Sequence, residues 1–581
     1  MIKILVKNFR WLDWLFVVAV LGITLFQVFC SMTLVSYSRA IIASISIDIP
    51  SQIDIAAVWW NAGMMVLFAA LSMVSQMAIA LMAALISAHL ATSLRNKINN
   101  KITYMSLSEI EKFSTASLIT RVTNDVQRVQ FAIVLSLRML FTAPTTFIWA
   151  VLTIQAVASE LTVMTLIAIG ALIVALIVLM LLLMPKFRLT QTLIDRVNLV
   201  TRENLVGVRV VRAFNAEGYQ EEKFGKANDD LTKLQLFTGR LSALFNPVIM
   251  ITMNGLSLGI YWLGATLINR GTTDYATLFA FSTLASMIVM SFMMLMFLFI
   301  MIPRAQVSAK RINEILDSKS RIKDPKEETA PKEKGTLVFK DVSFGYDNAE
   351  SRAIEHISFE AKQGETIAFV GATGSGKSTL IRLLLRLYEV SDGEILVDGV
   401  NVKELKQSTL HRIVRAVPQK GVLFTGSVAS NIAFGDPSLS QAEIQKAAEI
   451  ACADGFINEM DGGYEAHIAQ GGTNVSGGQR QRLCIARAVA LQPEIITFDD
   501  SFSALDFKTD QQVRANLKSA LASSTKIIVA ARVGTIMDAD KIVVLSEGKM
   551  VGYGRHEELL RSCPTYREIA LSQLSKEELG L

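Results

Sequence analysis

The chain is poor in cysteine and in charged residues for its length, and each shortage excludes a class of protein. Its 581 residues include only four cysteines, Cys30, Cys452, Cys484 and Cys563. They are far apart and form no CxxC pair, so the sequence predicts reduced thiols rather than a disulfide framework or a zinc site. Charged residues make up 19%, fewer than in most soluble proteins of this size. The basic residues behind the net charge of +5 are not gathered on one stretch, which argues against nucleic-acid binding.

A cleavage signal and an internal repeat are also missing. The first apolar stretch runs from about Trp14 to Leu34 behind a few basic residues, as a signal peptide would, but no convincing small-x-small cleavage site follows it. The stretch is long enough to cross a bilayer, which takes about 20 apolar residues. We therefore expect a retained transmembrane helix at this position. No fixed period repeats along the chain, so a solenoid is not indicated.

Long apolar segments are abundant, in keeping with a hydrophobic fraction of 51%. We expect six membrane helices at about 14–36, 57–88, 131–156, 160–184, 243–268 and 276–302. Two long connections, near 89–130 and 185–242, are rich in Lys and Arg. The positive-inside rule places both connections, the N-terminus and everything after Pro303 in the cytoplasm. Apolar residues at helical spacing within 106–130 and 192–238 suggest that the membrane helices continue into these connections.

The composition changes after the last apolar segment. Residues 317–335 combine many charges with Pro325 and Pro331, which predicts a linker between a transmembrane domain at 1–316 and a second domain at 336–575. In the second domain, apolar β-type runs alternate with helical patterns. The predicted fold class is therefore a multi-domain membrane protein, in which a six-helix α transmembrane domain precedes an α/β P-loop domain.

A phosphate-binding loop opens the chemistry of the second domain. Gly371–Ser378 reads GATGSGKS, which matches the pattern GxxxxGKS, and it lies between a predicted strand and a predicted helix. Backbone N–H groups of such a loop and the positive end of the helix suit phosphate oxygens. Lys377 is expected to contact the β- and γ-phosphates of ATP, and Ser378 to ligate Mg²⁺. Asp499 ends an apolar strand, where its carboxylate can reach the same metal.

Further motifs follow the order found in one protein family. Val475–Gln479, which reads VSGGQ, resembles the signature motif of ATP-binding cassette (ABC) transporters. Tyr346 resembles the aromatic residue that stacks on adenine, and Gln419 the glutamine that senses Mg²⁺ and the membrane domain. Ser503–Asp506 resembles the D-loop. Segments 113–125 and 203–214 are similar to the two long intracellular loops of bacterial multidrug exporters. The resemblance covers nearly the whole chain and implies an exporter-type half-transporter.

The resemblance also implies a set of site residues. The ATP-binding residues would be Tyr346, Gly371, Ala372, Thr373, Gly374, Ser375, Gly376, Lys377, Ser378, Thr379 and Gln419. The Mg²⁺ ligands would be Ser378, Gln419 and Asp499. In this family each ATP lies between the phosphate loop of one subunit and the signature of the other. Ser476, Gly477, Gly478 and Gln479 would therefore act on ATP held by a partner, with the D-loop residue Asp506 nearby.

Two positions depart from the pattern of active family members. The position after Asp499, which carries the catalytic Glu, is Asp500, and the switch histidine maps onto Ala531. Asp is one methylene shorter than Glu, and a misplacement of about 1 Å can cost on the order of 100-fold in rate. Loss of a positioned base costs about 100- to 10,000-fold. We therefore expect this chain to bind ATP and Mg²⁺ well but to hydrolyse its own ATP poorly. Gln470, just before the signature, often corresponds to Glu, and no effect can be assigned to it.

This asymmetry resembles one subunit of a heterodimeric exporter, in which one ATP site is degenerate and the other competent. The sequence predicts a second half-transporter as partner, with a homodimer as the less favoured arrangement, in the plasma membrane. The expected cargo is a hydrophobic drug or similar amphipathic compound. A lipid or peptide exporter and an ATP-gated channel or regulator are the alternatives. An importer is disfavoured, because importers of most types carry the membrane and nucleotide domains on separate chains.

The membrane half offers weaker candidates. The last apolar segment is rich in methionine, from Met287 to Met301, and such deformable surfaces suit varied apolar ligands as well as plain helix packing. Arg138 lies in or near the third span and could be functional or interfacial. Asp48, Asp54 and Asp274 are expected on the external side, either in a gate or as solvated loop charges.

Overall fold

The computed structural model describes residues 6–45, 54–157, 159–347 and 349–579. The chain forms two compact units. The first combines the residues up to Ile102 with Ala116–Ser318, and the second combines Thr103–Thr115 with the residues from Lys319 onward. Asp48 falls outside the described residues.

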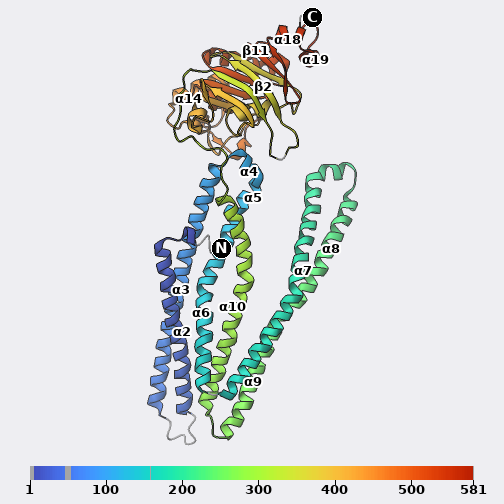
Figure 1. Cartoon of the computed structure of the whole chain (residues 1–581). Helices are drawn as coiled ribbons and strands as arrows, with labels where there is room; N and C mark the ends of the chain where they lie inside the picture. The colour runs from blue at the N-terminus through green and yellow to red at the C-terminus, as the bar shows by residue number, and fades with distance from the viewer. Residues whose placement is uncertain (1–5, 46–53, 158, 348, 580–581) are drawn as a thin grey trace. The chain divides into compact units, whose positions relative to one another are not determined.

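Long helices make up the first unit. They are α2 (Trp11–Ile45), α3 (Ile55–Thr103), α5 (Thr115–Thr120), the π-helical turn η2 (Arg121–Asp125), α6 (Val126–Val157), α7 (Ser159–Ala213), α8 (Glu217–Ala243), α9 (Phe245–Asn269) and α10 (Tyr275–Leu316). Helices α2, α3, α6 and α10 run side by side, and α7 and α8 form a long hairpin (Figure 1). Within the described part of the chain, six helical stretches are long and apolar enough to cross a membrane.

The helices are longer than the apolar segments that predict them. Helix α3 continues beyond the predicted span 57–88 to Thr103, and α7 continues beyond 160–184 to Ala213. Apolar composition marks only the part of a helix that lies in lipid, and the polar continuations keep their helical hydrogen bonds in water. The segment 192–238 is helical apart from the turn that joins α7 to α8, whereas 106–130 is divided among several short elements.

A buried charged network attaches the start of α6 to the end of α10. Asp125 is fully buried, accepts a hydrogen bond from Ser308 (2.8 Å) and lies 3.3 Å from the Arg311 guanidinium. Arg121 donates to the backbone carbonyl of Arg311 (2.7 Å) and to the Glu314 carboxylate (3.0 Å). A buried carboxylate is tolerated only when it is paired and hydrogen-bonded, so these contacts fix how the two helices meet.

The second unit is an α/β domain with two main sheets. An antiparallel sheet has the order β2-β1-β4-β5, formed by β1 (Leu337–Phe344), β2 (Ile354–Ala361), β4 (Asp392–Val397) and β5 (Val400–Asn401). A largely parallel sheet has the order β12-β11-β3-β10-β9-β6, formed by β3 (Thr366–Gly371), β6 (Val414–Val417), β9 (Ile495–Asp499), β10 (Thr525–Val529), β11 (Lys541–Ser546) and β12 (Lys549–Gly554). A short pair, β7 (Gly426–Ser427) and β8 (His467–Ile468), completes the strands of the described residues.

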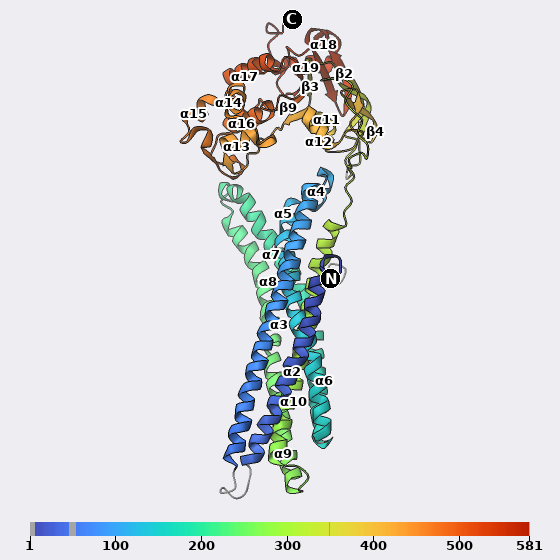
Figure 2. The same cartoon turned by 90° about the vertical axis from the view of Figure 1, so that its left-hand side faces the viewer.

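Helices surround the two sheets. They are α4 (Leu107–Phe113), α11 (Lys377–Leu384), α12 (Gln407–Ile413), α13 (Val428–Ile432), α14 (Gln441–Ile450), α15 (Asp454–Glu459), α16 (Gly477–Val489), α17 (Phe507–Ala520), α18 (His556–Ser562) and α19 (Pro564–Leu571). Figure 2 shows α13, α14, α15 and α16 grouped on one side of this unit, with β2 and β4 on the other. Each side has its own cluster of buried apolar side chains.

The segment 317–335, predicted as a linker, lies mostly on the second unit. Helix α10 ends at Leu316, and beyond it the Asp324 carboxylate accepts the Gln407 N–H (2.9 Å) while Glu328 accepts the Lys406 N–H (3.0 Å). These two carboxylates satisfy free N–H groups at the start of α12, where negative charge is favourable. The acidic residues on which the linker prediction partly rests therefore attach this segment to the start of α12.

Asp398 holds the end of this segment against the antiparallel sheet. Its carboxylate accepts the Thr336 N–H (3.1 Å), and its backbone carbonyl accepts the Lys332 N–H (2.9 Å). The second carboxylate oxygen of Asp398 and one oxygen of Glu494 are both buried without a hydrogen-bond partner. Burial, and to a smaller extent the neighbouring charges of Glu494 and Glu333, raises the pKa of Asp398 to about 6.

We predict that Asp398→Asn stabilises the second unit at pH 7.5 more than at pH 5. The pKa of Asp398 is higher in the folded chain than in the unfolded chain, so ionisation destabilises the fold above about pH 6. This cost disappears as the pH falls toward 4, and a shift of two pKa units corresponds to at most about 3 kcal/mol. Asn tolerates the left-handed backbone of this position (φ 51°) as well as Asp does.

The measurement is the thermal unfolding midpoint of the full chain at both pH values. Asp461→Asn, at an exposed residue, is the matched control and should shift the midpoint equally at pH 5 and pH 7.5. An Asp398→Asn effect that does not depend on pH would contradict the prediction.

Candidate nucleotide site

A cavity of about 650 Å³ lies at the carboxyl ends of the parallel strands. Strands β3 and β9 both pair with β10 in parallel, so the loop after β3 and Asp499 at the end of β9 reach the same edge of the sheet. Ligands of such sheets bind outside the carboxyl ends of the strands. Figure 2 shows α11, which follows the loop, beside β3 and β9.

Most residues that the sequence assigned to ATP line this cavity. They are Tyr346, Gly371, Ala372, Thr373, Gly374, Gly376, Lys377, Ser378, Thr379 and Gln419, joined by Asp499, Asp500 and Ala531. Ser375 does not line it, because its side chain is buried beneath the loop. Gly376 has a left-handed backbone (φ 99°), and a Cβ there would meet Ile354 at 2.6 Å, so only glycine fits directly before α11.

The Lys377 ammonium lies folded back over its own loop. It donates to the carbonyl oxygens of Gly371 (2.8 Å) and Ala372 (2.7 Å). Burial lowers the pKa of Lys377, although the nearby carboxylates of Asp499 and Asp500 act in the opposite direction. A half-buried ammonium that lines a cavity and bonds only neutral oxygens is suited to exchange them for phosphate oxygens.

Oxygen ligands suitable for Mg²⁺ converge beside Lys377. The Ser378 hydroxyl donates to the Asp499 carboxylate (2.8 Å), and Gln419 lies on the same cavity wall. Burial raises the pKa of Asp499, while the Ser378 hydrogen bond partly offsets this effect. Among the described residues, no group of three or more His, Cys, Asp or Glu could hold a metal ion alone. This donor set fits Mg²⁺, which keeps several water or phosphate oxygens and takes few protein ligands.

An aromatic side chain, that of Tyr346, also lines the cavity. The Tyr346 hydroxyl lies 3.1 Å from that of Thr379 and accepts a hydrogen bond from Arg382 (3.3 Å). The ring of Tyr388 packs edge-on against that of Tyr346 at 5.3 Å. Burial, with a smaller contribution from the charge of Glu111 in α4, raises the pKa of Tyr388. The first cytoplasmic connection therefore reaches the aromatic residues beside this cavity.

Asp500 and Ala531, the two positions at which the sequence analysis predicts departures from active family members, both line the cavity. Asp500 has a left-handed backbone (φ 48°), and its carboxylate lies 3.5 Å from the Gln419 amide, at the limit of a hydrogen bond. Ala531 presents only a methyl group to the cavity. Neither side chain offers the reach of Glu or the ring nitrogen of His.

A residue that sequence reasoning missed braces the Ala531 segment. Gln573, just after α19, donates to the Ala531 carbonyl (2.9 Å) and accepts the Val533 N–H (2.8 Å). Ile569, Ser572 and Gln573 also form part of the cavity wall. No motif marks these residues, because their place depends on how α19 packs against the sheet.

The signature residues lie elsewhere on the same unit. Ser476 caps α16: its hydroxyl oxygen accepts the Gln479 N–H (3.2 Å), and its own N–H donates to the Gln479 side chain (2.9 Å). Ser476 and Gly477 are exposed, and none of Ser476–Gln479 lines the cavity. Asp506 caps α17 through the Thr509 N–H (3.0 Å), and Gln470 is exposed. The structure thus gathers the loop residues and separates them from the signature.

Comparison with known proteins decides the family. The family model described as the ABC transporter transmembrane region matches residues 15–315, and the model described as ABC transporter matches residues 354–503. An uncharacterised ABC transporter ATP-binding protein of Mycobacterium tuberculosis is 39% identical over 484 residues, covering 82% of this chain and 83% of that protein. The chain belongs to the ABC transporter family.

Other ABC relatives cover different shares of the chain. An uncharacterised ABC transporter ATP-binding protein of Bacillus subtilis is 34% identical over 560 residues, which is 96% of both chains. An ATP-dependent lipid A-core flippase of Aromatoleum aromaticum is 34% identical over 391 residues, 67% of this chain and 65% of that one. The structure of a bacterial Atm1-family ABC exporter with ATP bound matches with a TM-score of 0.76 at 24% identity, covering 96% and 98% of the two chains. At this identity the match concerns the fold.

Membership of the ABC family confirms the fold class predicted from the sequence, a six-helix membrane domain followed by an ATP-binding cassette. The protein is a multi-pass membrane protein with a cytoplasmic ATP-binding domain. It uses ATP and Mg²⁺, and it couples ATP hydrolysis to transport.

We predict that Lys377→Ala weakens Mg²⁺–ATP binding about 10- to 100-fold, because it removes charge-assisted hydrogen bonds to phosphate. The dissociation constant of a fluorescent ATP analogue measures the effect. Lys362→Ala, at an exposed lysine outside the cavity, should leave it within about twofold. An equal loss of ATP affinity in both variants would contradict a role for Lys377 in ATP binding.

Proposed function

We propose that this chain is one subunit of an ATP-driven exporter that moves hydrophobic or amphipathic compounds out of the cell by alternating access. Membrane helices and an ATP-binding cassette on one chain support export over import. The flippase relative supports an amphipathic cargo, and a lipid is the second candidate. In this proposal, residues 1–316 form the membrane domain, 317–335 the connection and 336–575 the nucleotide domain.

The main support for the proposal is a nucleotide cavity whose residues for binding phosphate and Mg²⁺ are present, while its catalytic groups are incomplete. Lys377, Ser378 and Asp499 supply the ammonium, hydroxyl and carboxylate that hold phosphate and Mg²⁺. Asp500 lacks the length of Glu, and Ala531 lacks a hydrogen-bonding side chain. In the proposed cycle this site retains ATP and rarely cleaves it.

The signature segment has the opposite character. The hydroxyl oxygen of Ser476 already accepts one N–H, so its own hydrogen remains available to donate. The exposed N-terminus of α16 adds backbone N–H groups and the positive end of a helix, which favour a phosphate arriving from outside. This chain would then complete a competent site whose phosphate loop belongs to another subunit.

The incomplete catalytic groups and the intact signature together favour a partner that is a different half-transporter. Two copies of this chain would form two ATP sites, each with an intact signature and incomplete catalytic groups beside the phosphate loop. One copy beside a subunit with Glu and His at the matching positions would form one weak and one competent site. Closure of the paired domains on two ATP molecules biases the membrane helices outward, and hydrolysis at the competent site resets them.

We predict that the double variant Asp500→Glu, Ala531→His raises the ATP turnover of the purified chain at least about tenfold, because it restores a positioned base and a phosphate contact. Glu is less tolerant than Asp of the left-handed backbone, so the gain should stay below that of a natural competent site. A steady-state phosphate-release assay in detergent or nanodiscs measures the gain.

Two comparisons make this test sharp. Adding Ser476→Ala to the double variant should remove most of the gain, because the restored site would use the signature of a second copy. Wild-type chain alone should turn over much more slowly than the chain co-purified with its partner. If the chain alone matches the pair, the proposal of a degenerate site is wrong.

A further inference from the structure

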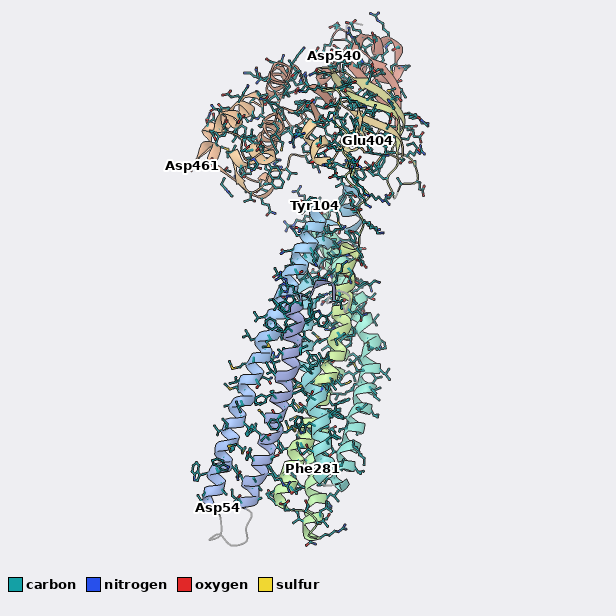
Figure 3. All side chains as sticks on the ribbon, turned by 60° about the vertical axis from the view of Figure 1, so that its left-hand side comes forward. Asp54, Tyr104, Phe281, Glu404, Asp461 and Asp540 are labelled. Carbon is teal, nitrogen blue, oxygen red and sulfur yellow. The ribbon has the colours of Figure 1, made fainter. Side chains whose placement is uncertain are left out.

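A cavity in the membrane unit lies outside the nucleotide site and outside the methionine-rich stretch of α10. Its volume is about 250 Å³, and it lies among α2, α6 and α10. Phe29, Met32, Trp149 and Phe281 give it a largely apolar wall, with the rings of Phe29 and Trp149 6.0 Å apart. Figure 3 labels Phe281 toward the end of the helix bundle that carries Asp54. Ligand pockets span about 300–1,000 Å³, so this one suits part of a larger molecule.

One charged side chain lines this cavity. Arg39 of α2 is exposed, and its guanidinium makes no hydrogen bond or ion pair with any residue that the structure describes. Its charge acts on the carboxylate of Asp274, which caps α10 by accepting the Thr277 N–H (3.0 Å). Burial disfavours the charge of Asp274, but the Thr277 hydrogen bonds and the charge of Arg39 outweigh it and lower the pKa. Asp274 is therefore held by its helix, and it interacts with Arg39 through charge, without a hydrogen bond or ion pair between them.

Among the residues that the structure describes, a second acidic candidate at this end also has a structural partner. Asp54 accepts the Ala57 N–H (2.9 Å) at the start of α3 and does not line the cavity. Arg39 is thus an available cation within about six residues, or 9 Å of helix, of the external end of α2 at Ile45. An arginine near the end of a membrane helix, on the wall of an apolar cavity, is a candidate for binding an anionic group.

Helix α6 continues the polar surface toward the cytoplasm. Arg138 precedes Trp149 by eleven residues, close to three full turns, so both lie on one face with Thr142 and Thr145 between them. Arg138 is also exposed, and its guanidinium has no partner among the described residues. It lies nineteen residues before Val157, about 28 Å of helix, which is close to the thickness of the hydrocarbon layer. Arg138 therefore lies within the expected third span, whereas Arg39 lies just beyond the expected first span.

We propose that this cavity binds an anionic amphiphile, with a phosphate or carboxylate head on Arg39 and an apolar body between Phe29 and Trp149. The inference rests on the proposed exporter function and names its substrate class. Arginine suits this role because its planar fork binds phosphate and carboxylate through two hydrogen bonds.

The test measures binding of radiolabelled dodecyl phosphate to the full chain in phosphatidylcholine nanodiscs, alone and co-purified with its partner. Dodecyltrimethylammonium and dodecyl maltoside carry the same tail with a cationic and a neutral head, and inorganic phosphate provides the head alone. We expect saturable binding of dodecyl phosphate, at least about tenfold tighter than the other three probes. Phosphate that binds as tightly as dodecyl phosphate would show an anion site without an amphiphile, and would overturn the proposal.

Variants locate the binding. Arg39→Gln should weaken dodecyl phosphate binding about tenfold or more, whereas Arg39→Lys should keep most of it. Arg270→Gln removes the same charge from an exposed residue just after α9, outside the cavity, and should change binding less than about twofold. Equal effects of Arg39→Gln and Arg270→Gln would show a general surface charge effect and overturn the proposal. Absence of binding to the co-purified pair would show that the partner covers the cavity, with the same consequence.

Transport by the same pair separates this inference from the proposed function. ATP-driven uptake of neutral or cationic compounds into inverted vesicles, with no dodecyl phosphate binding, would support the exporter function and contradict the anionic substrate class. Binding that depends on Arg39 without ATP-driven uptake of any of the three amphiphiles would keep the site and remove the exporter.

Discussion

The parallel pairing of β3, β10 and β9 determines where the chemistry of this protein lies. Because all three strands run in the same direction, the phosphate loop and Asp499 meet at one edge, and a single hydrogen bond from Ser378 joins them. Lys377, Gln419 and Asp500 are placed by the same edge. The remaining residues of the nucleotide cavity, including Gln573, complete its wall around the phosphate loop and Asp499.

Local signals predicted much of the fold and of the candidate site. The glycines of the phosphate loop, the apolar spans and the signature are short patterns whose meaning depends on neighbouring residues, so the sequence alone indicated them. Gln573 and Asp398 depend on contacts between distant segments, and no pattern marks them. The charges of 317–335 predict a linker, but they do not predict its hydrogen-bond partners, because Lys406 and Gln407 lie far along the chain.

In the membrane unit too, the sequence does not predict which side chains come together. Asp54 and Asp274, considered for an external gate, cap the starts of α3 and α10. The methionines of α10 do not line the cavity among α2, α6 and α10, whereas Arg39, one arginine among many in the sequence, does. Apolar composition predicts that a helix lies in lipid. It does not predict which of its few polar side chains remains without a partner once the helices have packed.

The position of Gln573 has a consequence for the making of the protein. The nucleotide cavity begins with Tyr346, yet part of its wall, and the brace on Ala531, come from residues 569–573. A nascent chain that already contains the phosphate loop, the signature and Asp499 still lacks one side of its nucleotide cavity. A polypeptide can therefore contain every ATP-binding motif that the sequence marks and still lack part of the wall of its nucleotide cavity.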